Sequence, residues 1–218
     1  MNTRFDFDKE YLKNVDFVIG TDEAGRGSGA GAVFAAAVCF LSIDINIIKM
    51  LEKLNDSKQL SEKTREELYA VIIKNSLWAV NSGSVEEIEN TNILKTSLST
   101  MKKCVYEITT KLKNENIIIL VDGNKKIPQC KYNQEAVVKG DCKSASIAAA
   151  SIIAKVTRDR YMLELDKEFP MYGWAENKGY MTKQHLAAVD KYGFTKWHRK
   201  NFFEKHLNKS NQLSLLNF

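Results

Sequence analysis

Four acidic residues stand in the sequence where strands are expected to end or a helix is expected to begin: Asp22, Glu23, Asp122 and Asp141. A carboxylate at the end of a buried strand lies at the rim of a sheet, where loops converge and ligands bind. Four carboxylates gathered there would repel one another, and Mg²⁺ or Mn²⁺ relieves that repulsion because these ions prefer oxygen ligands. Two such ions about 3.5–4 Å apart activate a water and stabilise the leaving oxygen in phosphodiester hydrolysis. The pattern therefore indicates metal-dependent hydrolysis of a phosphodiester.

Each acid also has a structural interpretation, because aspartate after a strand is often a turn former and Asp141 could cap the helix that follows it. The neighbouring pair Asp22 and Glu23 adds a geometric condition, since successive strand residues point to opposite faces. Both side chains reach one site only if the strand breaks there, and Gly25 indicates such a break. Alternatively, Glu23 contributes through its backbone carbonyl.

The segment 22–32, DEAGRGSGAGA, is rich in glycine, which lets a backbone approach another molecule closely and expose its N–H groups. The same segment fits the G-x-G-x-x-A pattern of dinucleotide-binding sites, with Asp44 near the distance expected for a ribose-binding acid. That interpretation requires a helix over 29–40, whereas a nuclease requires a strand there, and it leaves the four acids unexplained. Tight turns that only permit close packing are a third interpretation.

The elements that would position these residues alternate between strand and helix, which favours an α/β fold. Strand signals fall in four segments: 16–21, 32–41, 77–82 and 117–121. The segment 32–41 could equally be an Ala-rich helix, because periodicity does not decide between the two. Helices are expected over 61–74, 92–113, 144–169, 182–191 and 195–207. A further helix should begin at the capping box formed by Ser84 and Glu87.

The composition is that of an ordinary globular protein, since the 218 residues are 44% hydrophobic and 27% charged. A formal net charge of +5 fits a surface that binds a polyanion without establishing one. The four cysteines are spaced irregularly, which predicts neither a zinc site nor a disulfide framework. The N-terminus lacks the apolar core of a signal peptide, and the weakly polar run 29–41 is shorter than the roughly 20 residues of a membrane span. We therefore expect a cytoplasmic protein without a membrane contact.

Longer motifs follow one another in a fixed order along the chain: GTDEAGRG at 20–27, LNDSKQLSEKTREELY at 54–69, NILK at 92–95, VDGN at 121–124, KGDCKSASIAAASIIAKVTRDRYM at 139–162, YGWAENKGYMTKQH at 172–185 and HRKNF at 198–202. Together they resemble the type 2 ribonucleases H, the bacterial ribonuclease HII family, over roughly residues 15–203. The resemblance implies an α/β ribonuclease H-like fold, with a mixed five-stranded sheet flanked by helices and a small helical C-terminal part. It implies that the first three strands are antiparallel, with Asp22 on the first. The expected division is a catalytic domain over 1–170 and a C-terminal helical extension over 171–218 that takes part in substrate binding.

The resemblance also implies an activity, which is hydrolysis of RNA in RNA–DNA hybrids and cutting 5′ of single ribonucleotides embedded in duplex DNA. The products would carry 3′-hydroxyl and 5′-phosphate ends, and catalysis would use two Mn²⁺ or Mg²⁺ ions. Residue by residue, it implies that these metals are held by Asp22, Glu23, Asp122 and Asp141. Such an enzyme is expected to act as a monomer. The alternatives left open are a non-catalytic duplex-binding module and, less favoured, a dinucleotide-binding oxidoreductase.

For substrate binding, the resemblance implies that the 2′-hydroxyl is read by the backbone of Gly25, Arg26 and Gly27, and that Tyr180 packs on the sugar at the DNA–RNA junction. The 2′-hydroxyl is the group that separates RNA from DNA at a given position, and a glycine turn can bond it without a bulky side chain. Candidate phosphate binders are Lys58, Lys143, Ser144 and Ser146, the last three at a helix N-terminus, which favours anions.

The chain departs from the family in the glycine-rich turn. The family usually continues G-R-G with Pro-Leu-Ala-Gly-Pro, whereas residues 28–32 here are SGAGA. Losing two prolines is expected to make this turn more flexible and its reading of the 2′-hydroxyl less rigid. Basic residues that include Arg158 and Arg199 could form a duplex-binding face, or they could be a solvated helix surface. His185 and His198 are better read as structural residues, since two-metal hydrolysis needs no histidine.

Overall fold

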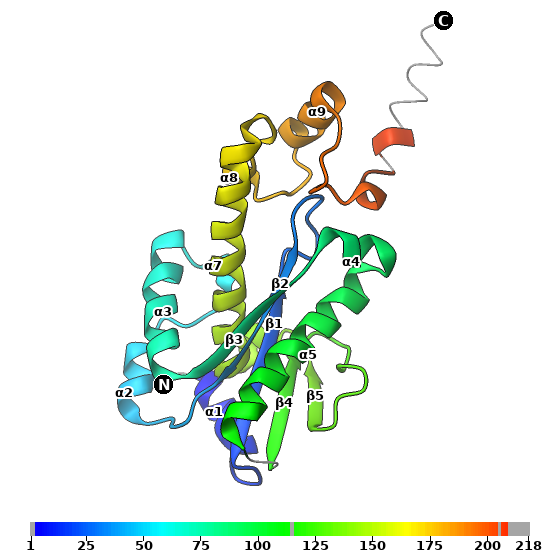
Figure 1. The fold of residues 1–218 in the computed structure, drawn as a ribbon. Helices are drawn as coiled ribbons and strands as arrows, with labels where there is room; N and C mark the ends of the chain where they lie inside the picture. Colours follow the sequence, from blue (N-terminus) through cyan, green and yellow to red (C-terminus); the bar gives the residue numbers. More distant parts are fainter. Residues whose placement is uncertain (1–2, 114–115, 205, 209–218) are drawn as a thin grey trace, which may run out of the picture.

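The computed structural model of the protein describes residues 3–113, 116–204 and 206–208. Its centre is a five-stranded sheet with the strand order β3-β2-β1-β4-β5 (Figure 1). The strands are β1 (Phe17–Ala24), β2 (Val33–Cys39), β3 (Leu77–Gly83), β4 (Ile117–Asp122) and β5 (Asn133–Val137). The first three strands pair antiparallel, whereas β4 and β5 run parallel to β1. The predicted α/β fold with a mixed five-stranded sheet is therefore confirmed.

Helices connect and cover the strands. The α-helices are α1 (Thr3–Tyr11), α2 (Ile45–Met50), α3 (Glu62–Asn75), α4 (Val85–Asn90), α5 (Ile93–Leu112), α6 (Gly140–Lys143), α7 (Ala145–Glu168), α8 (Trp174–Asn177) and α9 (Lys183–Tyr192). Short 3₁₀ turns are η1 (Ser57–Gln59), η2 (Pro170–Tyr172) and η3 (Lys200–Phe203). In the described residues no helix is both long and apolar enough to cross a bilayer.

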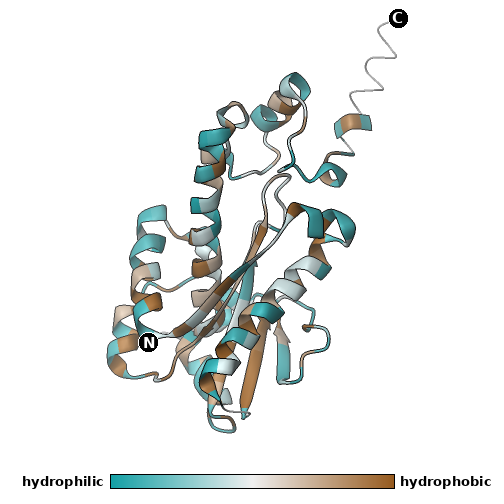
Figure 2. Cartoon of the chain, viewed as in Figure 1, coloured by the Kyte–Doolittle hydropathy of each residue, from teal (hydrophilic) through white to brown (hydrophobic). Residues whose placement is uncertain are grey.

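Both faces of the sheet are covered, which explains why its central strands read as continuous apolar runs. One face packs against α1, α3 and α7, and the other packs against α5. Figure 2 shows β4 as apolar along its length, and Ile119, on β4, is fully buried. The Ala-rich first half of α7 is buried against β1 and β2, where its small side chains let the helix approach the strands closely.

The structure decides the ambiguous segment 32–41 in favour of a strand, since β2 occupies Val33–Cys39 between β1 and β3. The dinucleotide-binding interpretation is therefore wrong, because it requires a helix there. Several elements carried signals too weak to be placed from the sequence, among them α1, α2, the short helices α6 and α8, and the edge strand β5. That strand alternates exposed and half-buried residues along most of its length and lacks a continuous apolar run.

The predicted helix over 195–207 is wrong in its first part, because residues 195–199 are not helical. Their backbone donors are used elsewhere. The N–H of Thr195 donates to Nδ1 of His198 over 3.0 Å, and the N–H of Arg199 donates to the carbonyl of Gly29 over 2.8 Å. The segment thus follows the glycine-rich turn, and helical structure forms only after it, as the 3₁₀ turn η3 and then as α-helical residues at 204 and 206–208.

The C-terminal part has a core of its own beyond the end of the sheet. There α7 extends past the strands (Figure 1) and contributes Met162 and Leu165 to a cluster with Trp174 and Phe203. The division into 1–170 and 171–218 stays a prediction, because α7 belongs to both cores. Residues 209–218 of the expected extension lie outside the described residues.

Candidate active site

Parallel pairing brings two of the four acids to the same edge of the sheet. The register between β1 and β4 ends with Thr21 opposite Val121, so the next residues, Asp22 and Asp122, are neighbours at the ends of adjacent strands. The Oδ1 of Asp122 accepts a hydrogen bond from the N–H of Gly140 over 2.7 Å. This bond joins the end of β4 to the start of α6, the helix that carries Asp141.

Glu23 reaches this edge by a route that the sequence did not indicate. The strand does not break at the acids, because β1 continues to Ala24 and pairs with β2 from Gly20 to Ala24. Since β4 ends at Asp122, Glu23 lies beyond the last pair on that side. Its side chain leaves the opposite face from Asp22 and remains close enough to Asp122 for the two carboxylates to repel each other. The long side chain at an uncovered strand end replaces the expected break.

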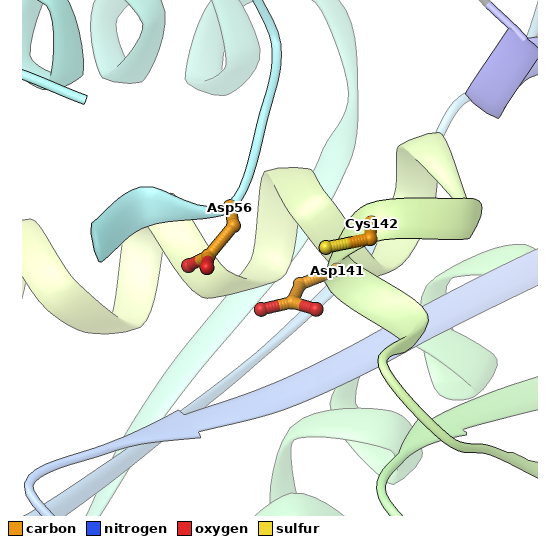
Figure 3. Close-up of side chains that lie close together, drawn as sticks. All are labelled: Asp56, Asp141 and Cys142. Carbon is orange, nitrogen blue, oxygen red and sulfur yellow. The ribbon is translucent and has the colours of Figure 1, made fainter. Parts of the chain in front are cut away.

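Asp141 comes from the other side of the site, and an acid that the sequence interpretation missed lies beside it. Figure 3 shows Asp56, Asp141 and Cys142 converging from the loop before η1 and from α6. The Sγ of Cys142 and one carboxylate oxygen from each aspartate lie within 4.8 Å of one another. Asp56 stands two residues before Lys58 in the motif LNDSKQLSEKTREELY, of which only Lys58 was a predicted site residue. In addition, Nε of Arg4 donates to the carbonyl of Asp141 over 3.2 Å.

The electrostatics of the four acids show that they share one environment. Burial raises the pKa of Asp22 well above its ordinary value, and the carboxylates of Glu23 and Asp122 raise it further. Burial and then Asp122 and Asp56 likewise raise the pKa of Asp141, which Lys58 lowers. Carboxylates that are crowded and partly desolvated in this way fit divalent cations, because hard oxygen donors are what Mg²⁺ and Mn²⁺ bind.

Lys58 and Arg26 are cations beside these carboxylates, and Nη1 of Arg26 lies 3.2 Å from Oε1 of Glu23. Burial alone would lower the pKa of Lys58, but Asp22 and Asp56 more than offset that effect and raise it. The lysine is held near the acids because Oγ of Ser57, its neighbour, lies 2.7 Å from Oγ of Ser151 on α7. A charged ammonium beside the acids suits contact with a phosphate of a substrate.

A cleft of about 390 Å³ opens next to the acids. It is lined by Glu23, Gly25, Arg26, Gly27, Lys58, Asp122 and Tyr180, among others. The ring of Tyr180 is 43% exposed and stands opposite the turn, since a Cβ built on Gly27 would lie 3.8 Å from its Cε1. The glycine backbone and the aromatic ring therefore form two facing walls, and Glu23 and Asp122 are the two of the four acids that line the same cleft.

Two of the predicted phosphate binders lie away from the cleft. Ser144 and Ser146 are buried, and the acceptor at the start of α7 is the carboxylate of Asp8 from α1. Its Oδ2 accepts from N–H and Oγ of Ser146 over 2.8 and 2.7 Å, while Oγ of Ser144 caps the helix at Ile147. The helix N-terminus is thus satisfied inside the protein, and these serines are not available to a phosphate. Lys143 is exposed on α6.

The two histidines lie in the C-terminal core. Nε2 of His185 is 3.2 Å from Nε2 of His198 and accepts a hydrogen bond from Nε1 of Trp174 over 3.1 Å. Burial lowers the pKa of both rings, and for His198 it reaches about 4. Both rings are buried within the C-terminal core, which agrees with the expectation that they are structural residues.

A mixed β-sheet of this topology with acids gathered at one edge defines a ribonuclease H-like nuclease. The family model described as "Ribonuclease HII" matches residues 19–209. The Ribonuclease HII of Pelagibacter ubique (strain HTCC1062) is 50% identical over 185 residues, which cover 84% of this chain and 94% of that relative. That of Fusobacterium nucleatum subsp. nucleatum is 48% identical over 208 residues, covering 94% and 93%.

Among solved structures, the PCNA:RNase HII complex from Archaeoglobus fulgidus matches with a TM-score of 0.67 and 30% identity. The match covers 84% of this chain and 93% of that one. The chain belongs to the ribonuclease HII family. It is therefore an endonuclease that acts on RNA–DNA hybrids, and a non-catalytic duplex-binding module is excluded.

Proposed function

We propose that the protein cuts on the 5′ side of single ribonucleotides embedded in duplex DNA, as well as within RNA–DNA hybrids. The products would carry a 3′-hydroxyl and a 5′-phosphate. The observation that carries this proposal is the cleft in which Gly25 to Gly27 and Tyr180 face each other, and which Glu23 and Asp122 also line. One nucleotide held between those walls would present its 2′-hydroxyl to the backbone and its 5′ phosphate to the acids.

In this proposal Asp22, Glu23, Asp122 and Asp141 hold two divalent cations, Mn²⁺ or Mg²⁺. When bound, these ions would neutralise the carboxylates, activate the attacking water and stabilise the leaving oxygen. Burial and then repulsion from Glu23 and Asp122 raise the pKa of Asp22, and this crowding of buried carboxylates supports the assignment. No histidine or other general base is required from the protein.

Binding and orientation of the substrate fall to other residues of the cleft. Backbone groups of Gly25, Arg26 and Gly27 would bond the 2′-hydroxyl, which is both a donor and an acceptor. Tyr180 would pack against the sugar, because an exposed aromatic ring on a rigid loop is a suitable platform. Lys58 would contact a phosphate near the cut, and Lys143 is a second, more exposed cation. All of these groups come from one chain, which favours a monomer as the acting form.

A DNA duplex that carries one ribonucleotide tests the proposal. The purified protein with Mn²⁺ or Mg²⁺ should give one product that migrates with a 3′-hydroxyl marker ending just before the ribonucleotide. EDTA should abolish the cut, and the matched all-DNA duplex should stay intact. A protein that cuts a continuous hybrid but leaves this duplex whole with both metals, or cuts it on the 3′ side, would refute the proposal.

A further inference from the structure

The turn that faces Tyr180 is built from residues that do not hold a conformation by themselves. Residues 25–32 read GRGSGAGA and contain no proline. Two of the glycines, Gly25 and Gly31, have φ angles of +89° and +80°, in the region that only glycine enters freely. Such a segment loses much conformational entropy when it is ordered. Its shape must therefore be imposed from outside.

Arg199 holds one side of this turn. Its Nη1 donates to the carbonyl of Gly25 over 2.7 Å and its Nε donates to the carbonyl of Gly31 over 2.9 Å. The main chain of Arg199 also contacts the turn, because its N–H donates to the carbonyl of Gly29 over 2.8 Å. A single buried side chain thus bridges two carbonyls that are six residues apart in the sequence.

Arg158, on α7, holds the other side. Its Nη2 and Nε donate to the carbonyls of Ala30 and Ala32 over 3.2 and 3.3 Å. Its Nη1 donates over 2.9 Å to the carbonyl of Lys178, two residues before Tyr180. The guanidinium of Arg158 also fills the space beside Gly25, where an added Cβ would lie 1.8 Å from its Nε. Arg158 therefore joins the turn to the segment that carries the facing ring.

This arrangement is expensive for the stability of the protein. Arg158 and Arg199 are 1% and 0% exposed, and within the described residues all their hydrogen bonds go to main-chain carbonyls. Burial lowers the pKa of both groups, and for Arg199 the nearby Arg158 adds to the effect. Buried charges without a carboxylate partner cost more than apolar packing would. Buried charged groups that lower the stability of a protein commonly serve its functional site rather than its hydrophobic core.

We propose that Arg158 and Arg199 are positioning residues for substrate selection: they hold the glycine-rich turn, and its spacing from Tyr180, in the geometry that meets a 2′-hydroxyl. The proposal rests on the proposed function of that turn. It reverses the expectation that a turn without prolines is flexible, since charged side chains from outside restrict it. It also gives the C-terminal part a role in selection that needs no contact between Arg199 and the substrate.

The test compares two substrates, a duplex with one ribonucleotide and a continuous RNA–DNA hybrid. A single ribonucleotide must meet the turn in one register, whereas a hybrid offers a 2′-hydroxyl at every position. Arg158→Lys and Arg199→Lys keep the charge but lose the planar fork. Each should lower kcat/KM for the single ribonucleotide about tenfold more than for the hybrid, the size expected for one charge-assisted hydrogen bond. Equal losses on both substrates would overturn the proposal.

Val189→Ala is the matched control, because Val189 is buried in the same C-terminal core and makes no hydrogen bond to the turn. It should lower the stability and, if anything, affect both substrates equally. A selective loss of activity on the single ribonucleotide in this variant would show that destabilising the C-terminal core is enough to change substrate selection. That result would also overturn the proposal.

We call the hold of Arg158, Arg199 and their neighbouring segments on the glycine-rich turn the brace. Amide hydrogen exchange on the unmodified protein tests this brace without any substrate. The N–H groups of Gly29 and Gly31 donate to the carbonyls of Gly179 and Trp197 over 2.9 and 2.8 Å, and they should exchange as slowly as amides of β1. Exchange at the rate of an unstructured peptide would refute the brace even if the arginine variants do not fold. If the amides are protected but the wild-type protein leaves the single ribonucleotide uncut, the proposed function fails and the brace stands.

Discussion

Burying a carboxylate is costly, and the protein uses two of its buried aspartates, Asp22 and Asp8, differently. Asp22 lies among other acids at the sheet edge, where cations can balance it. Asp8 lies at the start of α7, where hydrogen bonds from Ser144 and Ser146 and the helix N-terminus stabilise its carboxylate. The sequence predicts the first kind from strand ends, but it predicts the second kind poorly. Nothing near residue 8 indicates that α1 will cover α7.

Asp8 should make folding stability depend on pH in the direction opposite to that of a salt-bridged acid. Burial raises the pKa of Asp8 from 3.8 to about 6 despite hydrogen bonds from Ser144 and Ser146. Between these values the folded state keeps a proton that the unfolded state has lost, so this group's contribution to stability falls as pH rises from about 4 to 6. Above that range the loss should level off at roughly 2–3 kcal/mol.

Denaturant unfolding of the wild type and of Asp8→Asn at pH 4.5 and pH 7.5 measures the pH-dependent contribution of Asp8 to the free energy of unfolding. Titration of the four acids at the site is common to both proteins and cancels in the difference. The free energy of unfolding of the variant should rise relative to the wild type by roughly 2 kcal/mol between the two pH values. A constant difference, or one that falls with pH, would contradict the assignment.

At the scale of elements, the contact between β1 and α7 sets the position of the site. Strand β1 carries two of the acids, and α7 follows directly after α6, which carries Asp141. The long elements were predictable because their apolar residues are periodic or continuous and their caps are explicit, as at Ser61 and Ser84. The segment 195–199 was not, since its charged and aromatic pattern resembles a helix while a loop distant in sequence takes its hydrogen bonds.

Gly20 should be indispensable to this contact. A Cβ added there would lie 2.2 Å from the backbone N of Ile147 and 2.2 Å from the backbone carbon of Ser146. Backbone atoms cannot yield as a side chain does, so Gly20→Ala should cost ~3 kcal/mol or more in stability. The comparison is Gly27→Ala, whose added Cβ would meet only Cε1 of Tyr180 at 3.8 Å and should leave the melting temperature nearly unchanged. Equal melting temperatures for the two variants would show that α7 is free to shift.

At the scale of the whole molecule, the C-terminal part closes over the glycine-rich turn and completes the cleft (Figure 1). The motifs contained several of the residues that line the cleft, such as Gly25, Lys58 and Tyr180, although Ser144 and Ser146 lie elsewhere. The motifs did not predict how the residues of the cleft are held together. The roles of Arg158 and Arg199 depend on which groups are buried together, and a pattern of basic residues looks the same on a solvated helix as in a buried brace.

The most direct test of the central claim is the cleavage rate of Asp22→Asn on the duplex that carries one ribonucleotide, at saturating Mn²⁺ and saturating protein. Asparagine keeps the size of the side chain and removes its charge. Losing a group that holds the cations should lower the rate by more than about a hundredfold, beyond the effect of changing an outer-shell partner. A variant that folds normally and cuts within a few-fold of the wild type would contradict the claim that these carboxylates carry the chemistry.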